Sequence, residues 1–279
     1  MQTRISTLSE NTASRMGLLA EWGLSILVEV DNLRILFDAG QGTSTVHNAL
    51  AMGIDLSTID KIVLSHGHAD HTGGLRGLLG AMGKQVEVVA HPDVWAPKYV
   101  QRPGEEAYSY VGIPFEREEL EELGACFALA KEPVWITNHI VTTGEIPMLT
   151  DYEQIDANLY VEGESGFSPD RVMDDRALVV KTDLGLVVVA GCAHRGIINT
   201  LLHARELTGV EFINTVVGGT HLFRAQEEQI ELTVAELKQM GIQRLAVSHC
   251  TGFRASVRLA QEFGDIFSLN NAGTRFALP

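Results

Sequence analysis

Cysteine is scarce in this 279-residue chain, where it occurs only as Cys126, Cys192 and Cys250. An odd and sparse set of cysteines argues against a disulfide framework and is typical of a reducing compartment. We therefore expect a cytoplasmic protein whose fold does not depend on disulfide bonds.

Long apolar segments and positive charge are also in short supply. The sequence has no run of 18 apolar residues, and residues 1–17 lack the apolar segment of a signal peptide. The 21 lysines and arginines are outnumbered by 36 aspartates and glutamates, which gives a formal net charge of −15. This charge argues against a broad surface for nucleic acid or anionic membrane, although it does not exclude a local basic pocket. We expect a small-molecule substrate, with no nucleic-acid or membrane partner, and leave the oligomeric state open.

Apolar, β-rich runs alternate with segments of helical periodicity, which predicts an α/β protein. The predicted strands cover residues 24–30, 33–39, 61–66, 86–91, 177–182, 184–191, 213–219 and 244–250. The predicted helices cover residues 45–53, 75–83, 117–124, 196–209 and 225–241. The length allows one large domain or two small ones, and the lack of a clear linker favours a single domain over residues 1–279.

Two segments of the chain resemble each other. Residues 25–40 align without gaps on residues 177–192, and both read as two strands joined by a short turn and followed by a glycine-containing loop. Two unrelated hairpins would look much the same. The other interpretation is a protein of two related halves, each of which contributes loops to one edge.

The middle of the chain differs in composition from the rest. Between residues 92 and 175 lie seven of the eight prolines and several aromatic residues. Long, proline-rich loops within a compact domain are often lids or binding loops. We predict a lid-like insertion at about 92–175; an ordinary irregular connection is the alternative.

Residues 65–74 read Ser-His-Gly-His-Ala-Asp-His-Thr-Gly-Gly and follow a predicted strand, the position at which α/β proteins place their sites. His66 and His68 are two residues apart, so an extended backbone points both to one side. Asp70 and His71 follow at once. Imidazole and carboxylate are ligands for Zn²⁺, Fe²⁺ or Mn²⁺, and four in one short loop exceed the needs of one tetrahedral ion. Because burying them without a counter-charge is costly, we predict two divalent ions about 3.5–4 Å apart.

The remaining ligands are expected from loops that follow strands in the second half of the chain. The candidates are Cys192 and His194, then His221, then His249 with Cys250. Each has a plain alternative, because buried cysteines and hydrogen-bonded histidines are common in protein cores. The loop residue His139 is expected at the surface.

The His-x-His-x-Asp-His pattern resembles the signature of the metallo-β-lactamase superfamily. The resemblance implies a four-layer αβ/βα sandwich built of two similar halves. It also implies that His66 and His68 bind one metal ion and that Asp70 and His71 bind the second. A late histidine completes the second site in that superfamily, and here His249 corresponds to it.

Other positions depart from the superfamily pattern. Cys192 stands where most members have an aspartate that bridges the two metals, and the third-histidine motif Pro-Gly-His-Thr is missing. We predict His194 as a metal ligand in its place and keep Cys192 as a possible one. His221 is a possible substrate contact or ligand support. Asp38 is predicted to orient the site by hydrogen bonding, or else to be a turn aspartate.

The order of motifs along nearly the whole chain looks like the subfamily of 7,8-dihydropterin-6-methyl-4-(β-D-ribofuranosyl)aminobenzene-5′-phosphate synthase-like proteins. These motifs include Gly-Cys-Ala-His-Arg-Gly-Ile (191–197) and Ser-His-Cys-Thr-Gly (248–252). We predict a hydrolase of esters, lactones or phosphoesters that uses two divalent ions. Zinc is the expected metal, with iron or manganese as alternatives. Asp70 is also predicted to orient the attacking water. A synthase-like transferase or lyase and a non-catalytic small-molecule binding protein are the alternatives.

Overall fold

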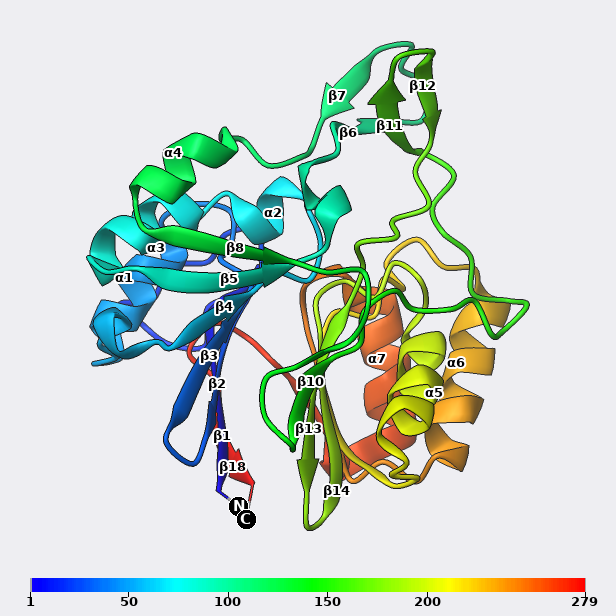
Figure 1. The fold of residues 1–279 in the computed structure, drawn as a ribbon. Helices are drawn as coiled ribbons and strands as arrows, with labels where there is room; N and C mark the ends of the chain where they lie inside the picture. The colour runs from blue at the N-terminus through cyan, green and yellow to red at the C-terminus, as the bar shows by residue number, and fades with distance from the viewer. Residues whose placement is uncertain (1, 279) are drawn as a thin grey trace.

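Two seven-stranded β-sheets face each other and carry helices on their outer surfaces, as a computed structural model describes for residues 2–278 (Figure 1). The first sheet has the order β18-β1-β2-β3-β4-β5-β8. Its strands are β18 (Arg275–Leu278), β1 (Thr3–Ser9), β2 (Ser25–Val30), β3 (Leu33–Phe37), β4 (Lys61–Val63), β5 (Val86–Ala90) and β8 (Ala125–Leu129). Its helices are α1 (Ser44–Ala51), α2 (Ala69–Thr72), α3 (Leu75–Met82) and α4 (Arg117–Glu122), with short 3₁₀ turns at Leu56–Thr58 and Pro92–Trp95.

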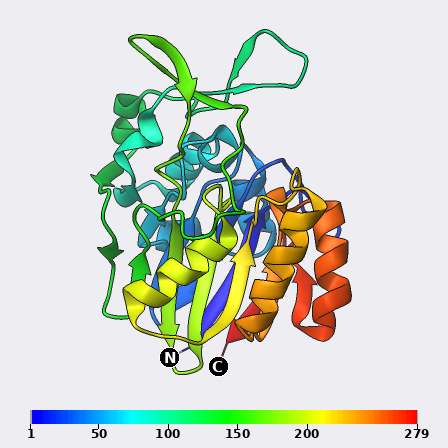
Figure 2. The same ribbon diagram turned by 90° about the vertical axis from the view of Figure 1, so that its right-hand side faces the viewer.

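The second sheet has the order β17-β16-β15-β14-β13-β10-β9. Its strands are β17 (Phe267–Leu269), β16 (Arg244–Val247), β15 (Ile213–Gly218), β14 (Gly185–Ala190), β13 (Ala177–Thr182), β10 (Ile140–Thr142) and β9 (Val134–Trp135). Helices α5 (Ile197–Thr208), α6 (Glu227–Gln239) and α7 (Phe253–Phe263) lie on its outer face, with 3₁₀ turns at His249–Thr251 and Gly264–Ile266. Figure 2 shows these helices stacked side by side in front of the sheet.

The two halves have the same strand arrangement. The hairpin β2–β3 is followed by parallel pairing of β3 with β4, β4 with β5 and β5 with β8. The hairpin β13–β14 is followed in the same way by parallel β15, β16 and β17. Both predicted hairpins are confirmed, and their shared surroundings favour two related halves over two unrelated hairpins.

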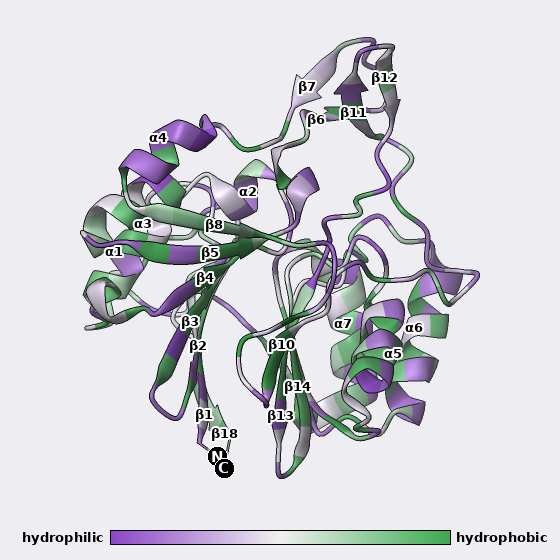
Figure 3. Cartoon of the chain, viewed as in Figure 1, coloured by the Kyte–Doolittle hydropathy of each residue, from purple (hydrophilic) through white to green (hydrophobic). Residues whose placement is uncertain are grey.

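The apolar core has three parts, which define four layers. One cluster packs α1 and α3 against the first sheet, a second packs α5–α7 against the second sheet, and a third fills the space between the sheets. The third includes Val28 and Phe37 from one sheet and Leu178 and Val189 from the other, all fully buried. Figure 3 shows the apolar strands between helices whose outer faces are hydrophilic. Each such side chain contributes about 1.5–3 kcal/mol on burial, and the predicted four-layer sandwich is confirmed.

A separate four-stranded sheet lies above the sandwich at the top of Figure 1, and we call it the capping sheet. Its order is β12-β11-β6-β7, with β12 at Gly166–Pro169, β11 at Leu159–Gly163, β6 at Lys98–Gln101 and β7 at Tyr108–Tyr110. Tyr108 stacks on Phe167 with a centroid distance of 3.9 Å, so aromatic contacts hold these short strands together. The predicted insertion at 92–175 contains this sheet, but it also supplies β8, β9 and β10 to the two main sheets.

Within the part of the chain that the structure describes, every helix is too short or too polar to cross a lipid bilayer.

Candidate metal centre

The cluster predicted at residues 65–74 lies at the carboxyl end of β4. His66 and His68 flank Gly67, and Asp70 and His71 sit in the short helix α2 that begins at Ala69. Gly67 is required because a Cβ atom there would collide with the carbonyl oxygen of Val94. The tight path allows both imidazoles to point into the space between the two halves of the molecule.

The second half contributes loops at the carboxyl ends of three parallel strands. Cys192 and His194 follow β14, His221 follows β15, and His249 opens the 3₁₀ turn after β16. His221 and His249 have left-handed φ angles of +50° and +55°, which non-glycine residues rarely adopt. Such backbone strain often persists where function requires a particular side-chain direction.

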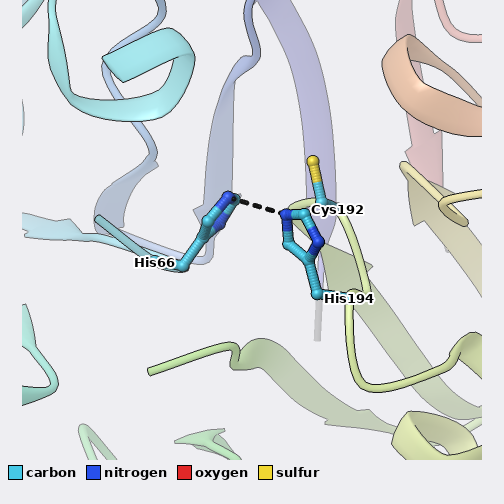
Figure 4. A group of neighbouring side chains, drawn as sticks. All are labelled: His66, Cys192 and His194. Atoms are coloured by element: carbon cyan, nitrogen blue, oxygen red, sulfur yellow. Dashed lines mark hydrogen bonds between the residues drawn. The ribbon is translucent and has the colours of Figure 1, made fainter. Parts of the chain in front are cut away.

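His66, His68 and His194 converge on one point. The His66 Nε2 atom lies 3.0 Å from His68 Nδ1 and 3.2 Å from His194 Nε2. Figure 4 shows His66 and His194 pointing toward each other from opposite sides, with Cys192 beside them. All of these side chains are buried.

His71 and His249 form a second group beside the first. The His71 Nε2 atom lies 3.2 Å from both His249 Nε2 and Cys192 Sγ. Asp70 joins them, with its Oδ2 atom 3.2 Å from His249 Nε2. Cys192 therefore lies between the two groups, and its Sγ atom is within 4.8 Å of ligand atoms in both.

Side chains behind the histidines fix their orientation. The fully buried Asp38 accepts hydrogen bonds from the Ser65 backbone N–H and hydroxyl and lies 2.7 Å from His71 Nδ1. Glu10 accepts the backbone N–H of His249, and Asn11 Oδ1 lies 2.9 Å from His249 Nδ1. Sequence reasoning predicted Asp38 but missed Glu10 and Asn11, because nothing in their spacing connects them to a histidine more than 200 residues away.

Burial and neighbouring charges divide the histidines into two kinds. Burial holds the pKa of His66 and His194 well below the ordinary value and lowers the pKa of His68 to about 3, so all three are neutral. Burial opposes charge on His71 as well, but the carboxylates of Asp38 and Asp70 outweigh it and raise the His71 pKa to about 9. The first group thus offers nitrogen lone pairs, and the second lies in a negative field that favours a cation.

The donor set fits two divalent ions. Nitrogens of three neutral imidazoles face one another in the first group, and His194 Nδ1 and His68 Nε2 are buried with no hydrogen-bond partner in the described residues. The second group adds two imidazoles and a carboxylate, and a sulfur atom adjoins both groups. Nitrogen, oxygen and sulfur are the ligands of Zn²⁺ and related ions. The structure brings all six predicted ligands together; metal binding by them stays a prediction.

His221 lies beside the two groups rather than within them. Its ring packs on that of His194 at a centroid distance of 4.0 Å, its Nε2 atom lies 3.2 Å from Asp156 Oδ2, and its backbone N–H points to Cys250 Sγ. Asp156 and the Cys250 sulfur overcome the effect of burial and raise the pKa of His221 to about 10. No sequence signal identified Asp156, because it lies in a connection with no recognisable motif. His139, by contrast, is exposed as predicted.

A cavity of about 410 Å³ opens directly onto these side chains. Its walls come from both halves and from the capping sheet, and they include three aromatic residues and two arginines: Trp22, Tyr110, Phe223, Arg102 and Arg224. Asp70, His68, His194 and His249 line the same cavity. A volume in this range holds a small molecule.

The fold and this cluster define the class of the protein. The sequence pattern of the metallo-beta-lactamase superfamily matches residues 23–198. The chain therefore belongs to that superfamily, as the sequence resemblance predicted.

Known proteins match over nearly the whole chain. The 7,8-dihydropterin-6-methyl-4-(beta-D-ribofuranosyl)-aminobenzene-5′-phosphate synthase of Methanocaldococcus jannaschii is 32% identical over 284 aligned residues, which cover 97% of this chain and 95% of that protein. The crystal structure of Tm1679, a metal-dependent hydrolase of the beta-lactamase superfamily, has a TM-score of 0.85 at 30% identity and covers 98% of both chains. Zn²⁺-bound PqqB from Methylobacterium extorquens is 12% identical with a TM-score of 0.59, covers 99% of this chain and 100% of its own, and is similar in fold alone.

Proposed function

We propose that this protein is a hydrolase that binds two divalent metal ions and cleaves an ester, lactone or phosphoester of a small molecule. The observation that carries the proposal is the convergence of His66, His68 and His194, and of Asp70, His71 and His249, at one end of the cavity. Two ions held there would supply Lewis-acid chemistry and lower the pKa of a water molecule. Zinc is the proposed metal, with iron or manganese as alternatives.

The chain's own residues orient the reactants. Asp70 exposes about a fifth of its side chain and lines the cavity, so Oδ2 is placed to accept a hydrogen bond from the attacking water. The neighbouring imidazoles keep the pKa of Asp70 below its ordinary value against the effect of burial. Asp70 is therefore ionised and acts as an acceptor across the physiological pH range.

The cavity walls indicate the class of substrate. Arg102 and Arg224 offer positive charge in a protein that is otherwise strongly acidic, and Trp22, Tyr110 and Phe223 offer flat apolar surfaces. Guanidinium groups bind carboxylate and phosphate, and aromatic rings stack on planar groups. We propose a small, anionic substrate with a planar ring, and no nucleic-acid or membrane partner. The free state of Cys126, Cys192 and Cys250 supports the reducing cytoplasm as the compartment.

A synthase or lyase is the second candidate function. The Methanocaldococcus jannaschii relative bears a synthase name, and the match covers nearly all of both chains. In such a reaction the same ions would act on a ribosyl-phosphate group without adding water to the product. Product analysis in ¹⁸O-labelled water separates the two, because only hydrolysis places the label in the product.

The test is a survey of activity with protein reconstituted with Zn²⁺, Fe²⁺ or Mn²⁺. Carboxylate esters, lactones, thioesters and phosphodiesters are offered in turn, and His68→Ala is compared with His139→Ala, whose histidine is exposed. We expect turnover of at least one class, its loss in His68→Ala and its retention in His139→Ala. Turnover that survives His68→Ala would contradict the proposal, and metal-loaded protein without any turnover would favour a binding protein.

A further inference from the structure

A buried ion cluster lies between the capping sheet and the histidine loop at residues 65–71. Lys98, the first residue of β6, is 1% exposed. Its Nζ atom donates to Asp170 Oδ2 and to Asp174 Oδ1, both at 2.9 Å. Lysine is almost never buried unless it is paired in this way.

Of the two aspartates, only Asp174 forms a hydrogen bond with the histidine loop. Asp174 Oδ2 accepts the backbone N–H of Gly67 at 2.7 Å, at the residue between His66 and His68. The other oxygen of Asp170 accepts the backbone N–H of Val172, two residues along its own segment. Asp170 and Asp174 therefore lie at the same distance from Lys98, but of the two only Asp174 hydrogen-bonds to the histidine loop.

The capping sheet holds the histidine loop at a second point. Ala69 donates its backbone N–H to the carbonyl oxygen of Val111, and Val111 donates its own N–H to the carbonyl oxygen of Lys98. The backbone N–H groups of Gly67 and Ala69, on either side of His68, are thus each hydrogen-bonded to a residue that is itself hydrogen-bonded to Lys98. Val100 of the same strand, β6, also lines the cavity, as does Arg102 directly after the strand.

A purely stabilising role does not account for such a cluster. Burying one cation with two carboxylates carries a large desolvation cost, and apolar side chains of similar volume often give equal or greater stability. The charged cluster instead fixes the orientation of the histidine loop. The Lys98 ammonium holds the carboxylate of Asp174, and that carboxylate holds the Gly67 peptide. Side chains that orient metal ligands commonly affect metal affinity by about 10–100-fold when they are altered.

We propose that Lys98 and Asp174 are positioning residues that set the geometry of His66 and His68 through the Gly67 peptide. Through them the histidine loop is joined to the capping sheet over the cavity. The inference rests on the proposed metal binding by these histidines. It assigns to the capping sheet a part in the metal centre in addition to covering the cavity.

The test compares Asp174→Asn with the matched control Asp170→Asn. Each variant is titrated with Co²⁺ in place of the native ion, and the visible absorption of bound Co²⁺ and its dissociation constants are recorded, together with the free energy of unfolding in urea. We expect Asp174→Asn to weaken Co²⁺ binding at least about tenfold and to change the absorption spectrum. Asp170→Asn should remain within about twofold of wild type with an unchanged spectrum, even if both variants lose stability.

Equal Co²⁺ affinities and unchanged spectra in both variants would overturn the inference and leave the cluster a structural one. If Asp174→Asn does not fold, Asp174→Glu is compared with Asp170→Glu by the same criteria, because glutamate keeps the charge for Lys98 while displacing the carboxylate. Failure of the proposed metal binding would look different, since wild-type protein itself would then bind no Co²⁺ at this site, and absence of hydrolysis alone would leave the Co²⁺ titrations unchanged.

Discussion

At the scale of single residues, the candidate centre is held by side chains that do not face the cavity. Asp38 is fully buried, has a left-handed φ of +61°, and contacts both Ser65 and His71. By accepting a hydrogen bond from His71 Nδ1, it holds the ring with Nε2 toward His249 and Cys192. Its position accounts for the orientation of His71 without any contact with a substrate.

Replacing Asp38 with asparagine should weaken metal binding at the second group. The amide carries no charge and cannot accept from both Ser65 and His71 as a carboxylate does, so the His71 ring loses its fixed orientation. We expect about 10–100-fold weaker binding in competition with a chromophoric chelator. The exposed Asp265 serves as the control through Asp265→Asn, and an effect of the same size there would refute the role given to Asp38.

Cys192 sets the expected metal preference. Burial raises the pKa of its thiol, and a bound cation would reverse that shift because coordination deprotonates sulfur. Sulfur is a softer ligand than oxygen, so Cys192→Ser should weaken Cd²⁺ binding far more than Mn²⁺ binding. Isothermal titration with both ions measures the change, with the exposed Cys126→Ser as reference. A loss of equal size for both ions would show that Cys192 is not a ligand.

The accuracy of prediction at this scale depends on sequence distance. His66, His68, Asp70 and His71 could be identified because their spacing alone places them on one loop. Contacts such as His221 with Asp156, or His249 with Glu10, join segments that only the tertiary fold brings together. No local pattern encodes such a pair.

At the scale of elements, α5 shows how a buried carboxylate begins a helix that follows a site loop. Glu153 is 3% exposed and accepts the backbone N–H groups of Ile198 and Asn199 in the first turn. Gly196 precedes the helix at φ +97°, and a Cβ atom there would collide with the Glu153 carboxylate. This contact fixes the start of α5 at Ile197, three residues after His194.

Burial raises the pKa of Glu153 above its ordinary 4.5, against the effect of its backbone hydrogen bonds. The native state therefore binds this proton more tightly than the unfolded state, and the contribution of Glu153 to stability falls as pH rises from about 4.5 through the native pKa. In Glu153→Gln that contribution is absent. Urea unfolding at pH 5 and pH 7 should show a smaller drop in unfolding free energy for the variant than for wild type, and equal drops would contradict the assignment.

The long apolar strands and amphipathic helices were predictable, but several elements were not. Strand β1 has only Ile5 and Leu8 as large apolar residues, and helix α7 buries only Ala255 and Leu259. The strands of the capping sheet have three to five residues and depend on contacts between distant aromatic rings such as Tyr108 and Phe167. Strands this short leave little periodicity in the sequence.

At the scale of the whole molecule, the two halves are joined by the apolar layer between the sheets. Leu178 in β13 is fully buried there, whereas Leu184 in the following turn is 44% exposed. Leu178→Ala should lower the free energy of unfolding by about 2–5 kcal/mol, because it leaves a cavity between the sheets. Leu184→Ala should change it by less than about 0.5 kcal/mol. Similar losses in chemical denaturation would argue against a continuous core between the halves.

The candidate metal centre lies at the seam between the same two halves. His66, His68 and His71 follow a strand of the first sheet, and His194 and His249 follow strands of the second. Neither half has a complete set of ligands, so the centre exists only when both halves are folded against each other. Bound ions would therefore add to the stability of the whole molecule by mass action.

Metal content tests most directly whether these side chains bind two ions. Elemental analysis by plasma mass spectrometry is applied to protein purified without chelator, for wild type and for the double variant His66→Ala with His71→Ala. We expect about two divalent ions per chain in wild type and a loss of both in the double variant. Wild-type protein without bound metal after reconstitution with Zn²⁺, Fe²⁺ and Mn²⁺, or a double variant with unchanged metal content, would contradict this expectation.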